Sequence, residues 1–239
     1  ERRWGRPPTL ALALGGGGSR GLAHIVVFEA LDELGVKPVA IAGTSVGAAM
    51  GAAYAAGLSG KDIRRDVIAL AHDRGEVIRR MLAARASGFA GFASGFANPM
   101  LADAEKLVRQ FLPAEIPEDF SELAIPLSVV ATDLYGRCEA VIEQGPLRQA
   151  IAASMAVPGL VRPMNIDGRI LVDGGAINPL PFEHVRGKAD LVLAVDIAAA
   201  PAGPRRGVPD PFETLFATMQ VMGFAIISEK LRHFTPDII

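Results

Sequence analysis

Short apolar runs alternate along this chain with stretches in which apolar residues recur at helical spacing. The first run, residues 10–14, ends at four consecutive glycines, and helical spacing follows over residues 20–34. A second run, residues 39–42, precedes a helical stretch over residues 46–56. Parallel strands need a long crossover connection, usually a helix, so this order is typical of α/β folds. We expect a three-layer α/β/α fold with a mainly parallel central sheet.

The rest of the chain continues the pattern. We expect further strands at residues 127–132, 140–143, 170–172 and 191–196, and helices at residues 147–154 and 213–231. The chain divides into an N-terminal extension (1–8), a main domain (9–200) and a Pro-rich linker with a C-terminal helix (201–239). The apolar stripe of that helix indicates packing on the domain, and it would also suit a homodimer interface or contact with a membrane.

Composition excludes several classes of protein. Half of the 239 residues are apolar, so the chain can bury a sizeable core, and its net charge of −2 offers no surface for nucleic acid. The single cysteine, Cys138, excludes an internal disulfide and a multi-cysteine metal site. Residues 38–60 carry no charge, but their many small residues favour a strand, a turn and a helix over a membrane span.

The strongest local signal is Gly43-Thr44-Ser45-Val46-Gly47, which follows an apolar run and begins a helical stretch. A serine on a sharp strand-to-helix turn projects its hydroxyl outward, and small neighbours make that turn possible. The start of the helix also favours negative charge near the serine. We therefore predict that Ser45 is a nucleophile.

A second glycine-rich turn, Gly15-Gly16-Gly17-Gly18-Ser19-Arg20-Gly21, also lies between a strand and a helix. Glycines without side chains can aim several backbone N–H groups at one point, which suits a phosphate or an oxyanion. Dinucleotide binding would need an acidic residue at the end of the next strand, but that strand leads into Gly43-Thr44-Ser45. An oxyanion hole is the preferred interpretation.

A serine nucleophile needs a base, and two candidates remain open at this stage. His184 follows Ser45 and Asp173 in the chain order of α/β hydrolases, although only a short turn separates it from Asp173. Asp173, in Leu171-Val172-Asp173-Gly174-Gly175, can instead face the serine directly from the end of a strand. A carboxylate can be the sole base if burial raises its proton affinity. His24 is expected to support the glycine loop.

Taken in order, Gly16-Gly17-Gly18-Ser19-Arg20-Gly21, Gly43-Thr44-Ser45-Val46-Gly47 and Asp173-Gly174-Gly175 resemble the three motifs of the patatin-like phospholipases. The stretches Ala153–Gly159 and Asn178–Pro181 are also similar to those of bacterial members. The resemblance covers residues 10–196, and three motifs at compatible spacing are far more specific than any one. Val26 stands where many bacterial relatives carry glycine.

The resemblance implies a patatin-like catalytic domain over residues 9–200, with a dyad of Ser45 as nucleophile and Asp173 as base. The remaining motif positions would form an oxyanion hole or support these groups: Gly16, Gly17 and Gly18 as oxyanion donors, and Ser19, Arg20, Gly21, Gly43, Gly47, Gly174 and Gly175 as supporting residues. Arg20 would either fix the loop or meet a lipid phosphate. No metal or organic cofactor is implied.

The implied activity is hydrolysis of lipid acyl esters, of the phospholipase A or lysophospholipase type. Two alternatives stay open: a carboxylesterase or thioesterase for small soluble esters, and a catalytically silent lipid-binding regulator. We expect a cytoplasmic protein that contacts a membrane peripherally and binds no nucleic acid. Residues 87–100, with three phenylalanines between glycines, would suit either a flap over an acyl pocket or a loop that completes the core.

Overall fold

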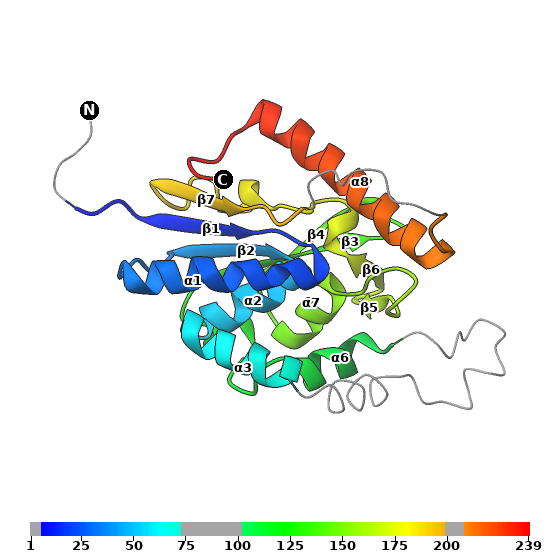
Figure 1. Cartoon of the computed structure of the whole chain (residues 1–239), viewed down its shortest axis with the longest axis horizontal. Helices are drawn as coiled ribbons and strands as arrows, with labels where there is room; N and C mark the ends of the chain where they lie inside the picture. Colours follow the sequence, from blue (N-terminus) through cyan, green and yellow to red (C-terminus); the bar gives the residue numbers. More distant parts are fainter. Residues whose placement is uncertain (1–5, 73–101, 199–207) are drawn as a thin grey trace.

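The computed structural model describes residues 6–72, 102–198 and 208–239 (Figure 1). The segment 87–100, for which a flap was considered, lies outside the described residues, as do most of the Pro-rich linker and the first five residues. Within the described ranges, no helix has both the length and the apolar character needed to cross a bilayer.

Seven strands in the described part of the chain form one sheet in the order β5-β6-β3-β2-β1-β7, with β4 also paired to β3. They are β1 (Leu10–Leu14), β2 (Ala40–Thr44), β3 (Leu127–Asp133), β4 (Cys138–Ile142), β5 (Met164–Ile166), β6 (Arg169–Asp173) and β7 (Leu191–Val195). The short strand β5 was not predicted. It pairs with β6 through Asp167-Gly168, both at positive φ, as a two-residue hairpin turn requires.

The α/β class and the central sheet flanked by helices are confirmed, and the sheet itself is mixed. The strands β3, β2, β1 and β7 run parallel. Beyond β3 the direction changes, because β4 and β6 are antiparallel to β3, and β5 is antiparallel to β6. The expected parallel pairing therefore holds for β3, β2, β1 and β7, and not for β4, β5 and β6.

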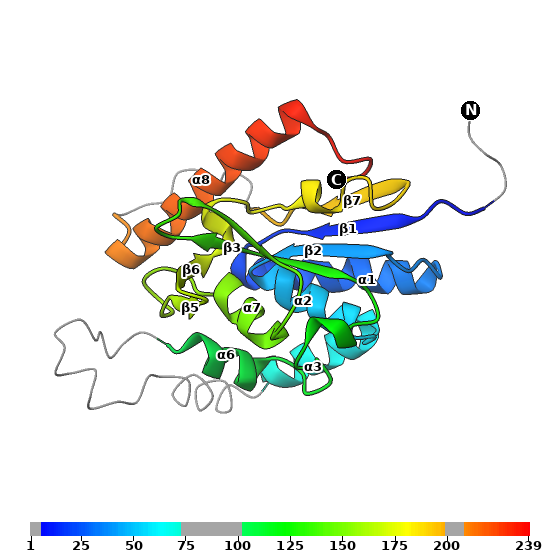
Figure 2. The same cartoon turned by 180° about the vertical axis from the view of Figure 1, so that it is seen from behind.

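Helices cover both faces of the sheet (Figures 1 and 2). One face carries α1 (Ala23–Glu33), α2 (Val46–Ala55), α3 (Gly60–His72), α6 (Ala104–Phe111) and α7 (Leu147–Ser154), and the other carries α8 (Pro211–His233). Successive side chains of β1 point to opposite faces of the sheet, so this strand contributes to the core on both faces. Its three leucines join the larger core with α1 and α2, and its two alanines join the core that includes Phe182 and Ile227.

The arrangement of β2 and β6 positions the site. Residues 41–44 of β2 pair with 127–130 of β3, and residues 171–173 of β6 pair with 131–133. Strand β4 pairs with residues 129–133, so it occupies the opposite edge of β3, and β2 and β6 share one edge. Since β2 is parallel and β6 antiparallel to β3, their carboxyl ends meet head-on. Thr44 lies opposite Val130 and Asp173 opposite Ala131, so Ser45 is brought to Asp173.

Candidate active site

Ser45 occupies the sharp turn between β2 and α2, with φ 55° and ψ −123°. A non-glycine residue at positive φ is uncommon and costs about 1–3 kcal/mol unless its surroundings enforce it. Close packing enforces it here, because α2 lies directly against the end of β1. A Cβ on Gly47 would fall 2.3 Å from the Leu14 carbonyl oxygen, and one on Gly43 would fall 2.6 Å from the Ala48 nitrogen.

A buried serine on a neighbouring helix holds the turn in place. The Ser45 N–H donates to Ser154 Oγ at 2.7 Å, and the Ser154 hydroxyl donates to the Val130 carbonyl at 2.6 Å. Ser154 ends α7 and is fully buried. No role was predicted for Ser154 from the sequence, although a polar residue on the buried face of a short helix was a usable signal.

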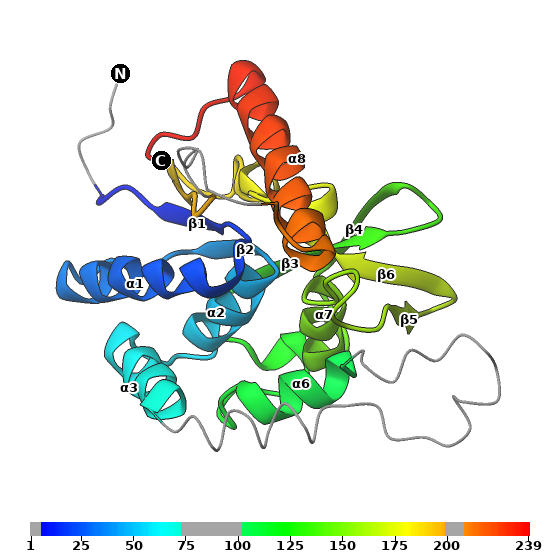
Figure 3. The same ribbon diagram turned by 45° about the vertical axis from the view of Figure 1, so that its right-hand side comes forward.

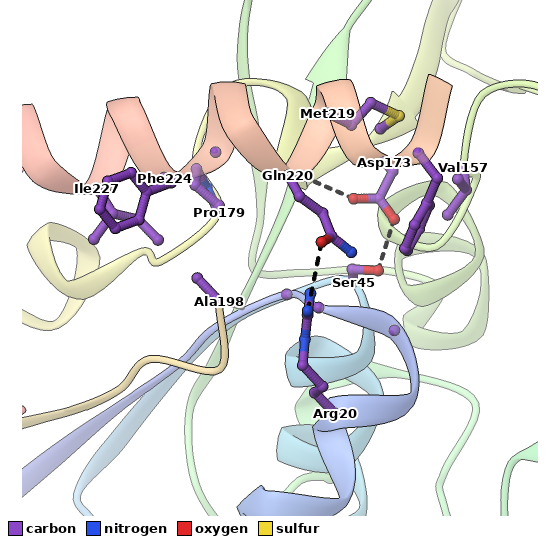
Figure 4. Close-up of a pocket in the computed structure, with 16 residues that line it drawn as sticks. Arg20, Ser45, Val157, Asp173, Pro179, Ala198, Met219, Gln220, Phe224 and Ile227 are labelled. Atoms are coloured by element: carbon purple, nitrogen blue, oxygen red, sulfur yellow. Dashed lines mark hydrogen bonds between the residues drawn. The ribbon is translucent and has the colours of Figure 1, made fainter. Parts of the chain in front are cut away.

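Asp173 faces Ser45 directly (Figure 4). The Ser45 hydroxyl donates to Asp173 Oδ2 at 2.6 Å, and the Gly175 N–H donates to Asp173 Oδ1 at 2.7 Å. The side chain of Asp173 lies at the end of β6, and the residue is 4% exposed. The following glycine is required by space, because a Cβ on Gly174 would fall 2.2 Å from the Val130 carbonyl oxygen.

Burial controls the protonation of this carboxyl group. Desolvation raises the pKa of Asp173 from 3.8 to about 6, and the hydrogen bonds from Ser45 and Gly175 oppose the rise only in part. The group is therefore mainly ionised at pH 7, with a proton affinity well above that of an exposed aspartate. These properties suit a general base that works near neutral pH.

The glycine loop after β1 runs beside the Ser45–Asp173 pair. Its Gly16 N–H donates to the Pro179 carbonyl at 2.9 Å, so the prediction of Gly16 as an oxyanion donor needs correction. In the part of the chain that the structure describes, the N–H groups of Gly17 and Gly18 have no acceptor. His24, expected to support the loop, is buried and bonds through Nε2 to the Gly15 carbonyl at 2.9 Å.

A pocket with about 660 Å³ of empty space, partly open to solvent, lies above the pair (Figure 4). Most of its lining is apolar, and α8 forms one wall, with Phe216, Met219, Gln220, Gly223, Phe224 and Ile227. The first half of α8 crosses beside the turn η3 (Gly174–Ala176), which follows β6 (Figure 3). The apolar stripe of α8, for which core packing was expected, therefore belongs in large part to the wall of this pocket.

The other motif residues have different surroundings. Arg20 lines the pocket, and its Nη1 lies 3.5 Å from Gln220 Oε1 on α8. Gly21 packs against Val46, since a Cβ there would fall 2.3 Å from Val46 Cγ2. Ser19 is exposed and does not line the pocket.

The structure separates His184 from the serine. His184 Nε2 lies 3.0 Å from Glu139 Oε2 of β4, and His184 does not line the pocket. Among the described residues, Glu139, Glu183 and His184 also form the one group whose spacing could hold a metal ion. The Lys230 ammonium lies 2.6 Å from Glu183 Oε2, so a positively charged side chain is already paired with this group.

Fold and site together define a class: α/β proteins with a serine on a strand-to-helix turn, paired with a buried aspartate at the carboxyl edge of the sheet. A family model described as patatin-like phospholipase matches residues 12–186. Because the match covers well over half of the chain, this chain belongs to the patatin-like phospholipase family.

Several relatives are similar to the chain. An uncharacterized NTE family protein of Mycobacterium tuberculosis is 40% identical over 200 residues, which are 83% of this chain and 52% of that protein. The human patatin-like phospholipase domain-containing protein 6 is 32% identical over 194 residues, which are 80% of this chain and 13% of that protein. The chain thus spans about half the length of the mycobacterial relative. The crystal structure of VipD from Legionella pneumophila aligns with a TM-score of 0.46 and 17% identity, over 72% of this chain and 47% of that chain.

Proposed function

We propose that this chain hydrolyses carboxylic esters of lipids, with Ser45 as nucleophile and Asp173 as its only side-chain base. One observation supports the proposal above all others: the 2.6 Å hydrogen bond from Ser45 Oγ to Asp173 Oδ2, at the base of an apolar pocket. A nucleophile and a base within hydrogen-bond reach are the requirement for activation of a serine hydroxyl. Membership of the patatin-like phospholipase family supports a lipid ester as the substrate.

The first half of the proposed reaction forms an acyl enzyme. Asp173 takes the Ser45 hydroxyl proton as Ser45 Oγ bonds to the ester carbonyl carbon. The carbonyl oxygen becomes an oxyanion, to which the Gly17 and Gly18 N–H groups donate, each contributing about 2.7–4 kcal/mol in comparable sites. The ester C–O bond then breaks, and the leaving alcohol takes the proton from Asp173.

The second half releases the fatty acid. Water gives a proton to Asp173 while its oxygen attacks the acyl carbon, and the same two amides stabilise the second oxyanion. The bond to Ser45 Oγ breaks, and Asp173 returns the proton to it. Every proton transfer uses the one carboxyl group, and its pKa of about 6 suits both directions of transfer near neutral pH.

The apolar wall supports an acyl chain as the part of the substrate that the pocket holds. Phe216, Phe224 and Ile227 offer hydrocarbon contacts, whereas Arg20 is the one charged side chain besides Asp173 among the lining residues that the structure describes. Such a lining favours a phospholipase A or lysophospholipase over an enzyme for short polar esters, because buried apolar area contributes about 0.8 kcal/mol for each CH₂ group.

The test is release of fatty acid from mixed phospholipid micelles by the wild type and three variants. We expect Ser45→Ala and Asp173→Asn to lose at least about 10³-fold in kcat, since each removes an essential part of the nucleophile. His184→Ala is the matched control, because it removes the rival base and leaves the Ser45–Asp173 bond untouched. It should retain activity.

Two outcomes would contradict the proposal. Loss of activity in a folded His184→Ala would replace the dyad with a triad. Hydrolysis of short water-soluble esters at rates independent of acyl length, with no release from micelles, would replace the lipid substrate with a small ester.

A further inference from the structure

One dipeptide, Asn178-Pro179, touches all three loops that carry the motif residues. The Asn178 N–H donates to the Gly174 carbonyl at 2.8 Å, next to Asp173. The Asn178 carbonyl accepts from Thr44 Oγ1 at 2.7 Å, next to Ser45. The Pro179 carbonyl accepts from the Gly16 N–H at 2.9 Å, next to the proposed oxyanion donors. The position of this dipeptide therefore determines how the base, the nucleophile and the oxyanion loop lie relative to one another.

The side chain of Asn178 is held as firmly as its backbone. Asn178 is 1% exposed. Its Nδ2 donates to Glu183 Oε1 at 2.7 Å, and its Oδ1 accepts a hydrogen bond from Lys230 Nζ. A buried amide with both ends bonded has one orientation, because rotation would leave donors and acceptors unpaired.

Lys230 belongs to α8, the helix that forms the pocket wall. Besides Asn178, its ammonium donates to the Leu180 carbonyl at 2.7 Å and pairs with Glu183 Oε2 at 2.6 Å. It also lies 4.5 Å from the centre of the Phe182 ring. The ammonium thus makes two hydrogen bonds and one ion pair, all to the segment 178–183, and this half-buried cation fastens α8 to the Asn178-Pro179 dipeptide.

We propose that Lys230 is a positioning residue for the reaction: through Asn178 it holds the dipeptide that aligns Gly16, Thr44 and Gly174. Lys230 acts at a distance, because it does not line the pocket. The effect of Lys230 on kcat rests on the proposed function, whereas its effect on the position of the Asn178-Pro179 dipeptide does not. Loss of the ammonium frees Asn178 Oδ1 and loosens the dipeptide, and misplacement of catalytic groups then lowers kcat.

The kinetic test uses Lys230→Met, which keeps the length and apolar stem of the side chain and removes the ammonium. The matched control is Arg232→Met on the same helix, whose side chain is 76% exposed and pairs only with Glu229 among the described residues. On a short p-nitrophenyl ester, we expect kcat of Lys230→Met to fall about 10- to 100-fold with KM within about twofold of the wild type. Arg232→Met should behave as the wild type.

A double-mutant cycle distinguishes positioning from general damage. Thr44→Val removes the hydroxyl that bonds to the Asn178 carbonyl and keeps the shape of the side chain. If Lys230 and Thr44 act through the same dipeptide, the double variant loses little more kcat than the worse single variant. Effects that multiply would overturn the proposal, and so would a kcat of folded Lys230→Met within about twofold of Arg232→Met.

Hydrogen exchange tests the structural part without any assay of hydrolysis. In Lys230→Met, peptides covering residues 15–22 and 174–180 should exchange faster, because the Gly16 and Asn178 N–H bonds are weakened. A peptide covering α6 serves as internal reference. Unchanged exchange in both loops would overturn the proposal, whereas faster exchange with an inactive wild type would contradict the proposed function alone. If Lys230→Met does not fold, Glu183→Gln replaces it, with the same expected direction of change.

Discussion

At the scale of single residues, the site depends on one carboxyl group kept away from water. The pKa of Asp173, about 6, lies above the 3.8 of an ordinary aspartate because burial disfavours its charged form. In the proposed mechanism, Asp173 must be ionised to accept the Ser45 proton. We therefore expect kcat/KM for an uncharged ester to rise with pH through an apparent pKa of about 6 and to fall tenfold per pH unit below it.

The measurement is kcat/KM as a function of pH, taken at substrate concentrations well below KM, with Arg232→Met as the control variant. A rising limb centred near pH 4 would show that the base is a solvated carboxyl group, and would contradict the role assigned to buried Asp173.

The same burial has a cost in stability. The folded-state pKa of Asp173 lies above the unfolded value, so the folded protein binds more protons between pH 3.8 and 6 and becomes less stable as pH rises through this window. Asp173→Asn removes the charge, and its amide can still donate to Ser45 and accept from Gly175. We expect the variant to be inactive but more stable than the wild type at pH 8, by up to about 3 kcal/mol.

Denaturant unfolding at pH 4 and pH 8 checks this, with exposed Asp196→Asn as the control. The stability gap should be largest at pH 8 and should shrink toward pH 4. An Asp173→Asn protein that is less stable than the wild type at both pH values would show that burial of the charge is fully compensated.

At the scale of elements, the contact between α2 and β1 leaves no space for a side chain at Gly47. A Cβ there would meet the Leu14 carbonyl oxygen at 2.3 Å, and backbone cannot rotate away as a side chain can. Gly47→Ala should destabilise the protein by at least about 3 kcal/mol, the upper end of usual overpacking costs, and should lower kcat by shifting Ser45.

The matched control for Gly47→Ala is Gly51→Ala, one turn further along α2. Its Cβ would lie 3.1 Å from the Ile41 and Leu14 side chains, which can adjust, and alanine favours a helix by about 1 kcal/mol. We expect a change within about 1 kcal/mol in unfolding free energy. Equal losses from the two variants would mean that helix packing in general, and not the turn, is the sensitive feature.

Across the whole molecule, the sequence predicted well those strands, helices and turns that depend on residues close together in the chain. The strand at 10–14, the helix at 147–154 and the turn around Ser45 were predicted at nearly their observed bounds, because apolar spacing and glycine positions encode them directly. Strands β4 and β6 were predicted as strands, but their antiparallel direction was not, since strand direction depends on pairings that tertiary packing determines. The contacts of Ser154 and Asn178 near the site, and the proposed role of Lys230, were missed for the same reason: they depend on partners 24 to 134 residues away.

The carboxyl ends of β2 and β6 meet head-on, and this arrangement also affects the order in which the protein folds. Ser45 and Asp173 are 128 residues apart in the chain, and β2 and β6 do not pair with each other: β3 is the strand with which both pair. During synthesis, the turn that carries Ser45 and the glycine loop emerge long before β6, the strand that carries Asp173. Contacts of such long range form late, after their loop-closure entropy has been overcome. A nascent or partly folded chain therefore has Ser45 without its proposed base, and the intact Ser45–Asp173 pair is a marker of completed folding.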